Sequence, residues 1–198
     1  ISKISSTIEI DVYYLSKYVE FYKKKDNEYN AFFLEKGRDF FFIPYIKKLI
    51  HHKEELYDIE TPYGYGGPII NSSDKLFIKM AWEKFFLAAK KDNIIAGLFR
   101  FNPFYEISKF EGLKNLNLVK EREIVILDLN KSEEEIFNNF SKDNKNKIKK
   151  AYKSNLIFEV CNSIEQLNDF SKIYISRMKQ KSALEMYLFS KFCKFWKD

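Results

Sequence analysis

The chain has 198 residues, of which 45% are hydrophobic and 31% are charged. This balance is typical of a globular protein with room for a full core, and it excludes a disordered chain. No apolar run approaches the ~18 residues that a membrane-spanning helix needs, and the net charge of +6 favours an anionic partner such as a nucleotide-linked sugar, coenzyme A, tRNA or an anionic lipid, without selecting one.

The first predicted elements are a strand at residues 8–12, a helix at residues 15–25, and strands at residues 30–35 and 39–47. The helix would carry Leu15, Tyr18, Val19 and Tyr22 on one face. The two strands flank Lys36-Gly37-Arg38-Asp39, a typical hairpin turn. Because residues 40–43 are continuously apolar, we expect the second strand of the hairpin to be central in its sheet.

A further strand at residues 56–59 leads into the most unusual stretch, residues 58–70, which read DIETPYGYGGPII. This stretch holds three of the six glycines and two of the four prolines of the chain. Glycine suits unusual dihedral angles and close approach, and tyrosine adds flat rings with hydroxyl tips. The loop residues Tyr63, Gly64, Tyr65, Gly66 and Gly67 are therefore candidates to offer backbone N–H groups and phenol hydroxyls to a ligand. The alternative is a rigid connection that packs its own tyrosines.

Residues 72–74, Ser-Ser-Asp, predict the N-cap of a helix at residues 75–91, which Asn93 ends. The apolar stripe of this helix consists of Ile78, Ala81, Trp82, Phe85 and Ala89. Its spacing is that of a core-facing helix. Strands are predicted at residues 94–101 and 124–129. The order of elements indicates an α/β fold, with a central mixed sheet that carries helices on its faces.

The later part of the chain predicts more helix. Acidic residues after Ser132 open one helix, residues 156–160 read as a strand, and Ser163 caps a helix at residues 164–179. A last helix from residue 183 has an apolar stripe of Leu184, Tyr187, Leu188, Phe192 and Phe195. Because nothing later in the sequence would cover that stripe and the sequence begins at Ile1 rather than Met, we interpret the chain as the N-terminal portion of a longer protein or a shortened relative. The same stripe is a candidate dimer surface. A signal peptide that has been removed from the N-terminus is an alternative explanation for the missing Met.

Two charged groups are candidate binding elements. Arg100 and Asn102 lie at the end of the strand predicted at residues 94–101, and a guanidinium recognises diphosphate or carboxylate groups in a bidentate way. If they flank the same cleft as the tyrosine-glycine loop, they complete a cradle for such a group. Four lysines of a basic run could add phosphate attraction, namely Lys145, Lys147, Lys149 and Lys150. The alternatives are a surface ion pair for Arg100 and a solvated helix face for the lysines.

Metal and redox chemistry are not predicted. Cys161 and Cys193 lie far apart without a metal-binding spacing, which predicts buried free thiols in the reducing cytosol. The adjacent His51 and His52 point different ways on any regular element, so we interpret them as surface or loop residues. No P-loop, nucleophile elbow, zinc-protease motif or dinucleotide fingerprint occurs, and no catalytic residue is identified.

Four stretches resemble, in order, the Fem-like branch of the GNAT acyltransferase superfamily. They are residues 11–15 (DVYYL), 58–68 (DIETPYGYGGP), 99–104 (FRFNPF) and 146–151 (NKIKKA). The resemblance implies that residues 1–161 form a GNAT-like N-terminal lobe and that residues 162–198 are a helical segment that opens a second lobe. It also implies an acyl or aminoacyl transferase that forms an amide bond on a cell-wall or envelope precursor.

In such enzymes the first lobe helps to bind a nucleotide-linked cell-wall precursor, and the donor is an aminoacyl-tRNA or an acyl-CoA rather than a tightly bound cofactor. The chain departs from the superfamily in lacking the Arg/Gln-x-x-Gly-x-Gly/Ala turn that holds the pyrophosphate of coenzyme A. Acetyl-CoA binding by this chain alone is therefore not expected. The first alternative is a non-catalytic module that holds a precursor or partner, and the second is a nucleic-acid-binding protein that uses the basic helix.

Overall fold

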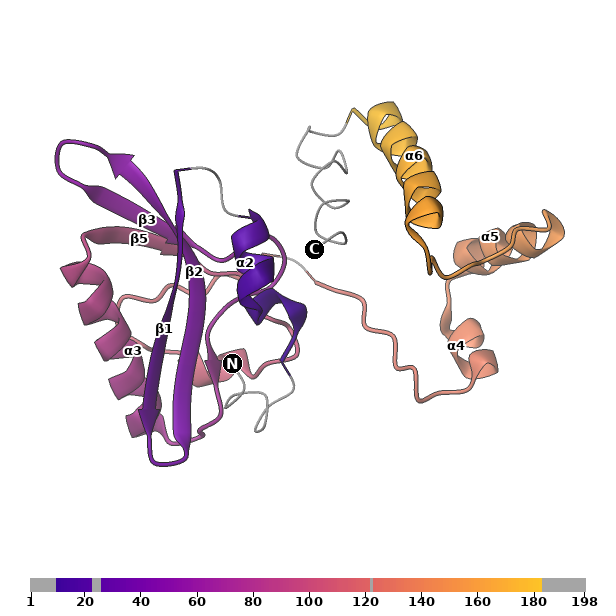
Figure 1. Cartoon of the computed structure of the whole chain (residues 1–198). Helices are drawn as coiled ribbons and strands as arrows, with labels where there is room; N and C mark the ends of the chain where they lie inside the picture. The colour runs from indigo at the N-terminus through magenta and orange to yellow at the C-terminus, as the bar shows by residue number, and fades with distance from the viewer. Residues whose placement is uncertain (1–9, 23–25, 122, 183–198) are drawn as a thin grey trace. The chain divides into compact units, whose positions relative to one another are not determined.

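The computed structural model describes residues 10–22, 26–121 and 123–182, and the chain divides into two compact units, residues 1–118 and 119–198 (Figure 1). The predicted boundary after Cys161 lies inside the second unit. Within the described residues, no helix has the length and apolar character needed to cross a membrane. The apolar helix predicted from residue 183 and its candidate dimer surface lie outside the described residues, as does Cys193.

The first unit is built on a mixed five-stranded sheet. Its strands are β1 (Glu28–Lys36), β2 (Asp39–His51), β3 (Leu56–Glu60), β4 (Ile69–Ile70) and β5 (Ile94–Leu98). The order is β1-β2-β3-β5, with β4 paired to β2. Strands β1, β3 and β4 are antiparallel to β2, whereas β5 runs parallel to β3. The prediction of a mixed sheet flanked by helices is confirmed.

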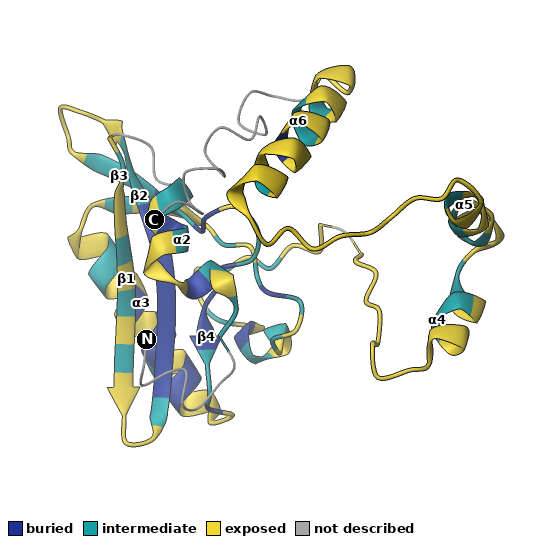
Figure 2. Ribbon diagram, turned by 45° about the vertical axis from the view of Figure 1, so that its right-hand side comes forward, coloured by how far each residue is buried: buried dark blue, intermediate teal, exposed yellow. Residues whose placement is uncertain are grey.

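The predicted hairpin forms where its turn residues place it. Lys36 pairs with Asp39, so Gly37 and Arg38 alone make the turn between β1 and β2. Gly37 adopts a φ of 65°, which glycine tolerates at little cost. Strand β2 lies between β1 on one side and β3 and β4 on the other, and residues 40–46 are all buried (Figure 2). The apolar run at residues 40–43 thus marks the central strand, as predicted.

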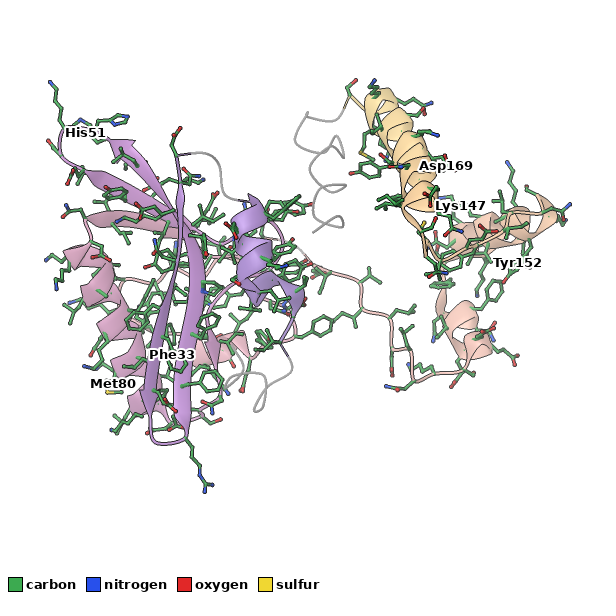
Figure 3. The ribbon with its side chains drawn as sticks, in the orientation of Figure 1. Phe33, His51, Met80, Lys147, Tyr152 and Asp169 are labelled. Atoms are coloured by element: carbon green, nitrogen blue, oxygen red, sulfur yellow. The ribbon has the colours of Figure 1, made fainter. Side chains whose placement is uncertain are left out.

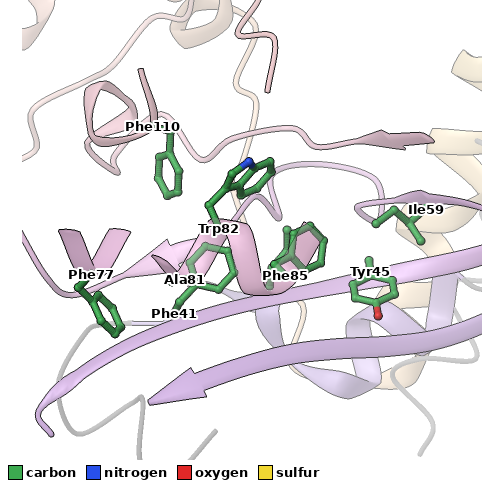
Figure 4. Packing of buried hydrophobic residues seen from close by; sticks show 9 residues of the cluster. Phe41, Tyr45, Ile59, Phe77, Ala81, Trp82, Phe85 and Phe110 are labelled. Carbon is green, nitrogen blue, oxygen red and sulfur yellow. The ribbon is translucent and has the colours of Figure 1, made fainter. Parts of the chain in front are cut away.

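Helix α3 (Lys75–Lys91) covers one face of the sheet and has the predicted bounds. The Asp74 carboxylate caps it by accepting a hydrogen bond from the Leu76 N–H at 2.8 Å. Its buried side chains pack on β2 and β3 in an aromatic core that includes Trp82, Phe85 and Phe41 (Figure 4). The predicted stripe is confirmed as core at four positions, and Ala89 at the fifth is half-buried.

The opposite face of β2 is covered by the 3-10 helix η1 (Val12–Tyr14) and helix α2 (Ser16–Tyr22). Tyr14 packs there with Phe40, Phe42 and Ile69. The strand predicted at residues 8–12 is therefore wrong at Val12, which begins η1, while residues 8–9 lie outside the described residues. Because both faces of β2 carry a layer, its alternate side chains are buried on both sides, which explains its continuous apolar run.

Strand β5 ends at Leu98, three residues earlier than predicted. The chain from Phe99 onward leaves the ladder because the Arg100 carbonyl bonds to the tyrosine-glycine loop instead of to a neighbouring strand. A short 3-10 helix, η2 (Ile107–Phe110), then returns Phe110 to the core beside α3.

The second unit contains three described helices, α4 (Glu133–Asn139), α5 (Lys142–Lys153) and α6 (Ile164–Gln180). Each begins at a serine that accepts a backbone hydrogen bond, and Ser132 and Glu135 form a reciprocal capping box. The predicted Ser163 cap and the helix after it are confirmed.

The two strands predicted in the second unit do not form. Residues 124–129 and 156–160 pair with no strand within the described part of the chain, and their side chains are exposed. Both are rich in β-branched and aromatic residues, but strand preference expresses a fit to a pleated neighbour and forms no ladder by itself. Cys161 follows the second segment and is exposed and free, which corrects its predicted burial.

Candidate functional site

The tyrosine-glycine loop is held against the segment after β5 by main-chain hydrogen bonds. The Arg100 carbonyl accepts from the N–H groups of Gly66 at 2.9 Å and of Gly67 at 3.0 Å. The Arg100 N–H in turn donates to the Thr61 hydroxyl at 3.1 Å. Thr61 continues the pairing of β3 with β5 through its own N–H, which donates to Leu98. The structure therefore brings the predicted loop and the predicted arginine together.

These bonds determine which groups remain for a ligand. The N–H groups of Gly66 and Gly67 point at Arg100 and are buried with their residues, so they do not form an outward anion cradle. Asn102 is only 3% exposed, and its carboxamide accepts from the Phe104 N–H and donates to Asp11. Asn102 thus shapes the turn from inside the protein.

Glycine is required at two loop positions by close approach. Gly64 has a φ of 93°, and its α-carbon faces the ring of Tyr13. A Cβ on Gly67 would lie 2.9 Å from the Cα of Phe101. The glycines therefore let the loop pack tightly between η1 and the segment after β5.

A cluster of five tyrosines surrounds the loop, which we call the tyrosine cluster. It consists of Tyr13, Tyr18, Tyr22, Tyr63 and Tyr65. The Tyr13 ring meets those of Tyr18 and Tyr65 edge to face, with centroids 5.3 and 5.8 Å apart. The Tyr22 ring stacks on that of Tyr63, and the Tyr18 hydroxyl donates to the Tyr63 carbonyl at 2.9 Å. Helix α2 and the loop are thereby joined through aromatic rings.

Burial tunes the acidity of these phenols. Burial is the main cause that raises the pKa of Tyr13, and the nearby Asp11 carboxylate raises it further. Burial also raises the pKa of Tyr18 and of the neighbouring Tyr14. These hydroxyls stay protonated at neutral pH, so they can act as hydrogen-bond donors but not as anionic bases.

Two side chains of the predicted site face solvent. Arg100 is exposed, and its guanidinium has no ion-pair or hydrogen-bond partner among the residues that the structure describes. The ring of Tyr63 is 51% exposed. Tyr65 is half-buried against Tyr13. A cation and an aromatic ring are therefore the groups that this loop region offers to a partner.

The predicted basic residues belong to helix α5 in the second unit, and the structure separates them into two kinds. Lys147, labelled in Figure 3, pairs with Asp143. The Lys145 ammonium donates to the Asn138 carbonyl at 2.8 Å. Lys149 and Lys150 are exposed, and their side chains make no hydrogen bond or ion pair with any other described residue.

The structure contains no further constellation of catalytic type in its described residues. No group of three or more His, Cys, Asp or Glu side chains there is placed to hold a metal ion. His51 and His52 are exposed at the β2–β3 turn, as predicted (Figure 3). A shallow hollow of about 270 Å³ over β3 and β5 is lined by residues such as Asp58 and Glu60, and it includes no residue of the loop from Thr61 to Pro68.

Tyr13, Tyr18 and Tyr22 were not part of the predicted site. Tyr18 and Tyr22 lie four residues apart on one predicted helix face, and that spacing is the signal that could have indicated them. Their contact with the loop spans more than forty residues of chain and is not visible in the sequence.

No protein-family model, curated protein or solved structure matches the chain.

Proposed function

We propose that the first unit is the precursor-binding lobe of an acyl or aminoacyl transferase of the Fem-like GNAT type, which forms an amide bond on a nucleotide-linked cell-wall or envelope precursor. The observation that carries the proposal is that the main chain and the side chain of Arg100 have different roles. Its main chain holds the tyrosine-glycine loop, while its guanidinium stays exposed and without a partner among the described residues.

The chemistry of these groups suits a nucleotide-linked sugar. A guanidinium binds the oxygens of a diphosphate in a bidentate way, and the attraction is stronger than for a neutral donor. The half-exposed Tyr63 ring offers an aromatic surface to a base or a sugar face. Because its ring stacks on Tyr22 and its carbonyl is held by Tyr18, the surface is preorganised, which lowers the entropy cost of binding.

In the proposed reaction the nucleophile is an amine of the acceptor, and the donor is an activated ester such as an aminoacyl-tRNA or an acyl-CoA. The lone pair of the amine attacks the donor carbonyl, the bond from that carbonyl to the ester oxygen or thioester sulfur breaks as the amide bond forms, and the proton lost by the amine ends on the alcohol or thiol that leaves. The protein contributes orientation and charge stabilisation. The lobe's part in this scheme is to hold the acceptor.

A second candidate is a non-catalytic module that binds the same precursor or a partner. It is favoured by the engagement of the loop's own polar groups, since the amides of Gly66 and Gly67 and the carboxamide of Asn102 are all bonded within the protein. Such groups would otherwise be the natural donors to a developing negative charge.

Binding calorimetry and a turnover assay separate these functions. The proposal expects the chain to bind a UDP-linked muropeptide and to lose that affinity when Arg100 is replaced by alanine. Transfer from an aminoacyl or acetyl donor to that muropeptide would identify a transferase, and binding without transfer would favour the module. Absence of muropeptide binding by the unchanged chain would contradict the transferase proposal and the precursor-binding form of the module.

A further inference from the structure

Helix α5 carries most of its unpaired positive charge as a single stripe. The helix contains six lysines and one aspartate, and at 100° per residue four of the lysines fall within about a third of its circumference. These four, which we call the lysine stripe, are Lys142, Lys149, Lys150 and Lys153. All are exposed, and none makes an ion pair or hydrogen bond through its side chain with any other described residue.

The remaining two lysines of the helix are the ones that have partners. Lys147 pairs with Asp143 and Lys145 bonds to the Asn138 carbonyl. The only acidic side chain of the helix, Asp143, lies about 20° from Lys150 around the helix axis and pairs with Lys147. An ordinary solvated surface helix mixes both signs of charge, whereas this stripe is uniformly cationic.

Exposed apolar side chains follow the stripe directly along the chain. The helix ends at Lys153, Asn155 turns the backbone with a φ of 50°, and residues 156–160 continue in an irregular extended path. In this segment Phe158 is 90% exposed and Ile157 83% exposed, and Leu156 and Val160 are also exposed. These four residues, which we call the apolar strip, are interrupted by the exposed Glu159. Tyr152 at the end of the helix is exposed as well (Figure 3).

The composition of the strip distinguishes between two anionic partners. Nucleic acids bind lysines through their phosphates and aromatic rings through base stacking, whereas aliphatic side chains add little to the affinity for nucleic acid. An anionic bilayer binds both lysines and aliphatic side chains favourably. Lysines are attracted to its headgroups, and aliphatic side chains gain transfer free energy when they enter its acyl chains. Three of the four apolar residues of the strip are aliphatic.

We propose that the lysine stripe and the apolar strip bind the surface of an anionic lipid membrane. The lysines would lie over the headgroups, Tyr152 at the interface, and Ile157 and Phe158 would enter the boundary of the acyl chains. This is peripheral attachment. It is independent of the proposed transferase function, because it uses residues of the second unit only.

Sedimentation with vesicles tests the role of charge. The full chain should bind vesicles in which about one third of the lipid is phosphatidylglycerol, and it should bind pure phosphatidylcholine vesicles weakly. Its affinity for the anionic vesicles should fall as salt is added. Replacing Lys149, Lys150 and Lys153 by glutamine keeps helix preference and should weaken binding on the order of a hundredfold. The matched control replaces Lys84, Lys90 and Lys91 by glutamine, which removes the same charge from exposed positions of α3. Equal loss in both variants would overturn the proposal.

Insertion of the strip needs its own readout. In a Phe158→Trp variant, vesicles with brominated acyl chains should quench fluorescence beyond the level seen for the unchanged chain. Replacing Ile157 and Phe158 by serine should weaken binding at least tenfold, whereas Leu76→Gln with Leu87→Gln on α3 should not. No binding to anionic vesicles, or no added quenching, would overturn the proposal. Tighter binding to RNA that survives the serine changes would assign the stripe to nucleic acid instead.

Discussion

A Cβ on Gly64 would lie 2.2 Å from Cε1 of the Tyr13 ring, far inside van der Waals contact. Tyr13 belongs to η1 and Gly64 to the tyrosine-glycine loop, so this contact joins the covering layer of the sheet to the candidate site. The glycine at this position of the loop therefore has a structural reason, which is the fit of the loop backbone against the edge of the Tyr13 ring.

The Gly64→Ala variant should lower the free energy of unfolding of the first unit by at least about 2 kcal/mol. The change combines a left-handed φ with overpacking against Tyr13. Gly37→Ala is the control, because Gly37 also has a positive φ but has no atom within 4 Å of the added Cβ, and it should cost only about 1 kcal/mol. Urea unfolding followed by Trp82 fluorescence, in a Trp196→Phe background, measures both. Equal losses would show that the contact with Tyr13 does not matter.

The Arg100→Ala variant should weaken muropeptide binding by roughly ten- to a hundredfold, as expected for the loss of charge-assisted hydrogen bonds. It should leave stability nearly unchanged, because the bonds from Arg100 to the loop use main-chain atoms that alanine retains. Arg38→Ala, in the exposed hairpin turn, serves as the charge-matched control for binding by calorimetry. A variant that binds normally would remove Arg100 from the proposed site.

The Tyr14→Phe variant should raise the free energy of unfolding by about 1 kcal/mol. The Tyr14 ring is 1% exposed, and its hydroxyl has no hydrogen-bond partner among the described residues. Removing a buried polar group that lacks a partner recovers its desolvation cost, whereas removing a bonded hydroxyl usually destabilises. Urea unfolding at neutral pH tests this, and a destabilised variant would indicate that the hydroxyl is bonded.

Stability should also fall at alkaline pH. Burial raises the pKa of Tyr14 and Tyr18 above the ordinary value of 10.0, so below that pH both states keep the phenol protons. Above it the unfolded chain loses protons that the folded chain retains, and unfolding becomes more favourable as pH rises. Each such group contributes up to about 1.4 kcal/mol per pH unit. The decline should begin near pH 10 and be shallower in Tyr14→Phe, and a flat profile between pH 9 and 11 would argue against burial of these phenols.

Local signals in the sequence were reliable where the interaction itself is local. Gly37 between two strands, Asp74 before α3 and Ser163 before α6 each predicted the turn or cap that the structure contains. These motifs involve residues within four positions of one another, so the chain specifies them without reference to the rest of the fold.

Predictions that depended on a distant partner fared less well. Residues 124–129 and 156–160 have the composition of strands but pair with no described strand. The loop was expected to present its amides, yet Gly66 and Gly67 donate theirs to Arg100, more than thirty residues later.

The sequence by itself therefore determined the described α-helices, the hairpin, the central strand and the loop with the unusual composition, because hydrophobic periodicity and turn chemistry act over a few residues. Only the tertiary structure decided which polar groups of that loop remain available and which apolar segments stay exposed. The physical reason is that a polar group is hydrogen-bonded, or an apolar side chain covered, only when the fold brings a partner next to it. The path of the whole chain decides which partner that is.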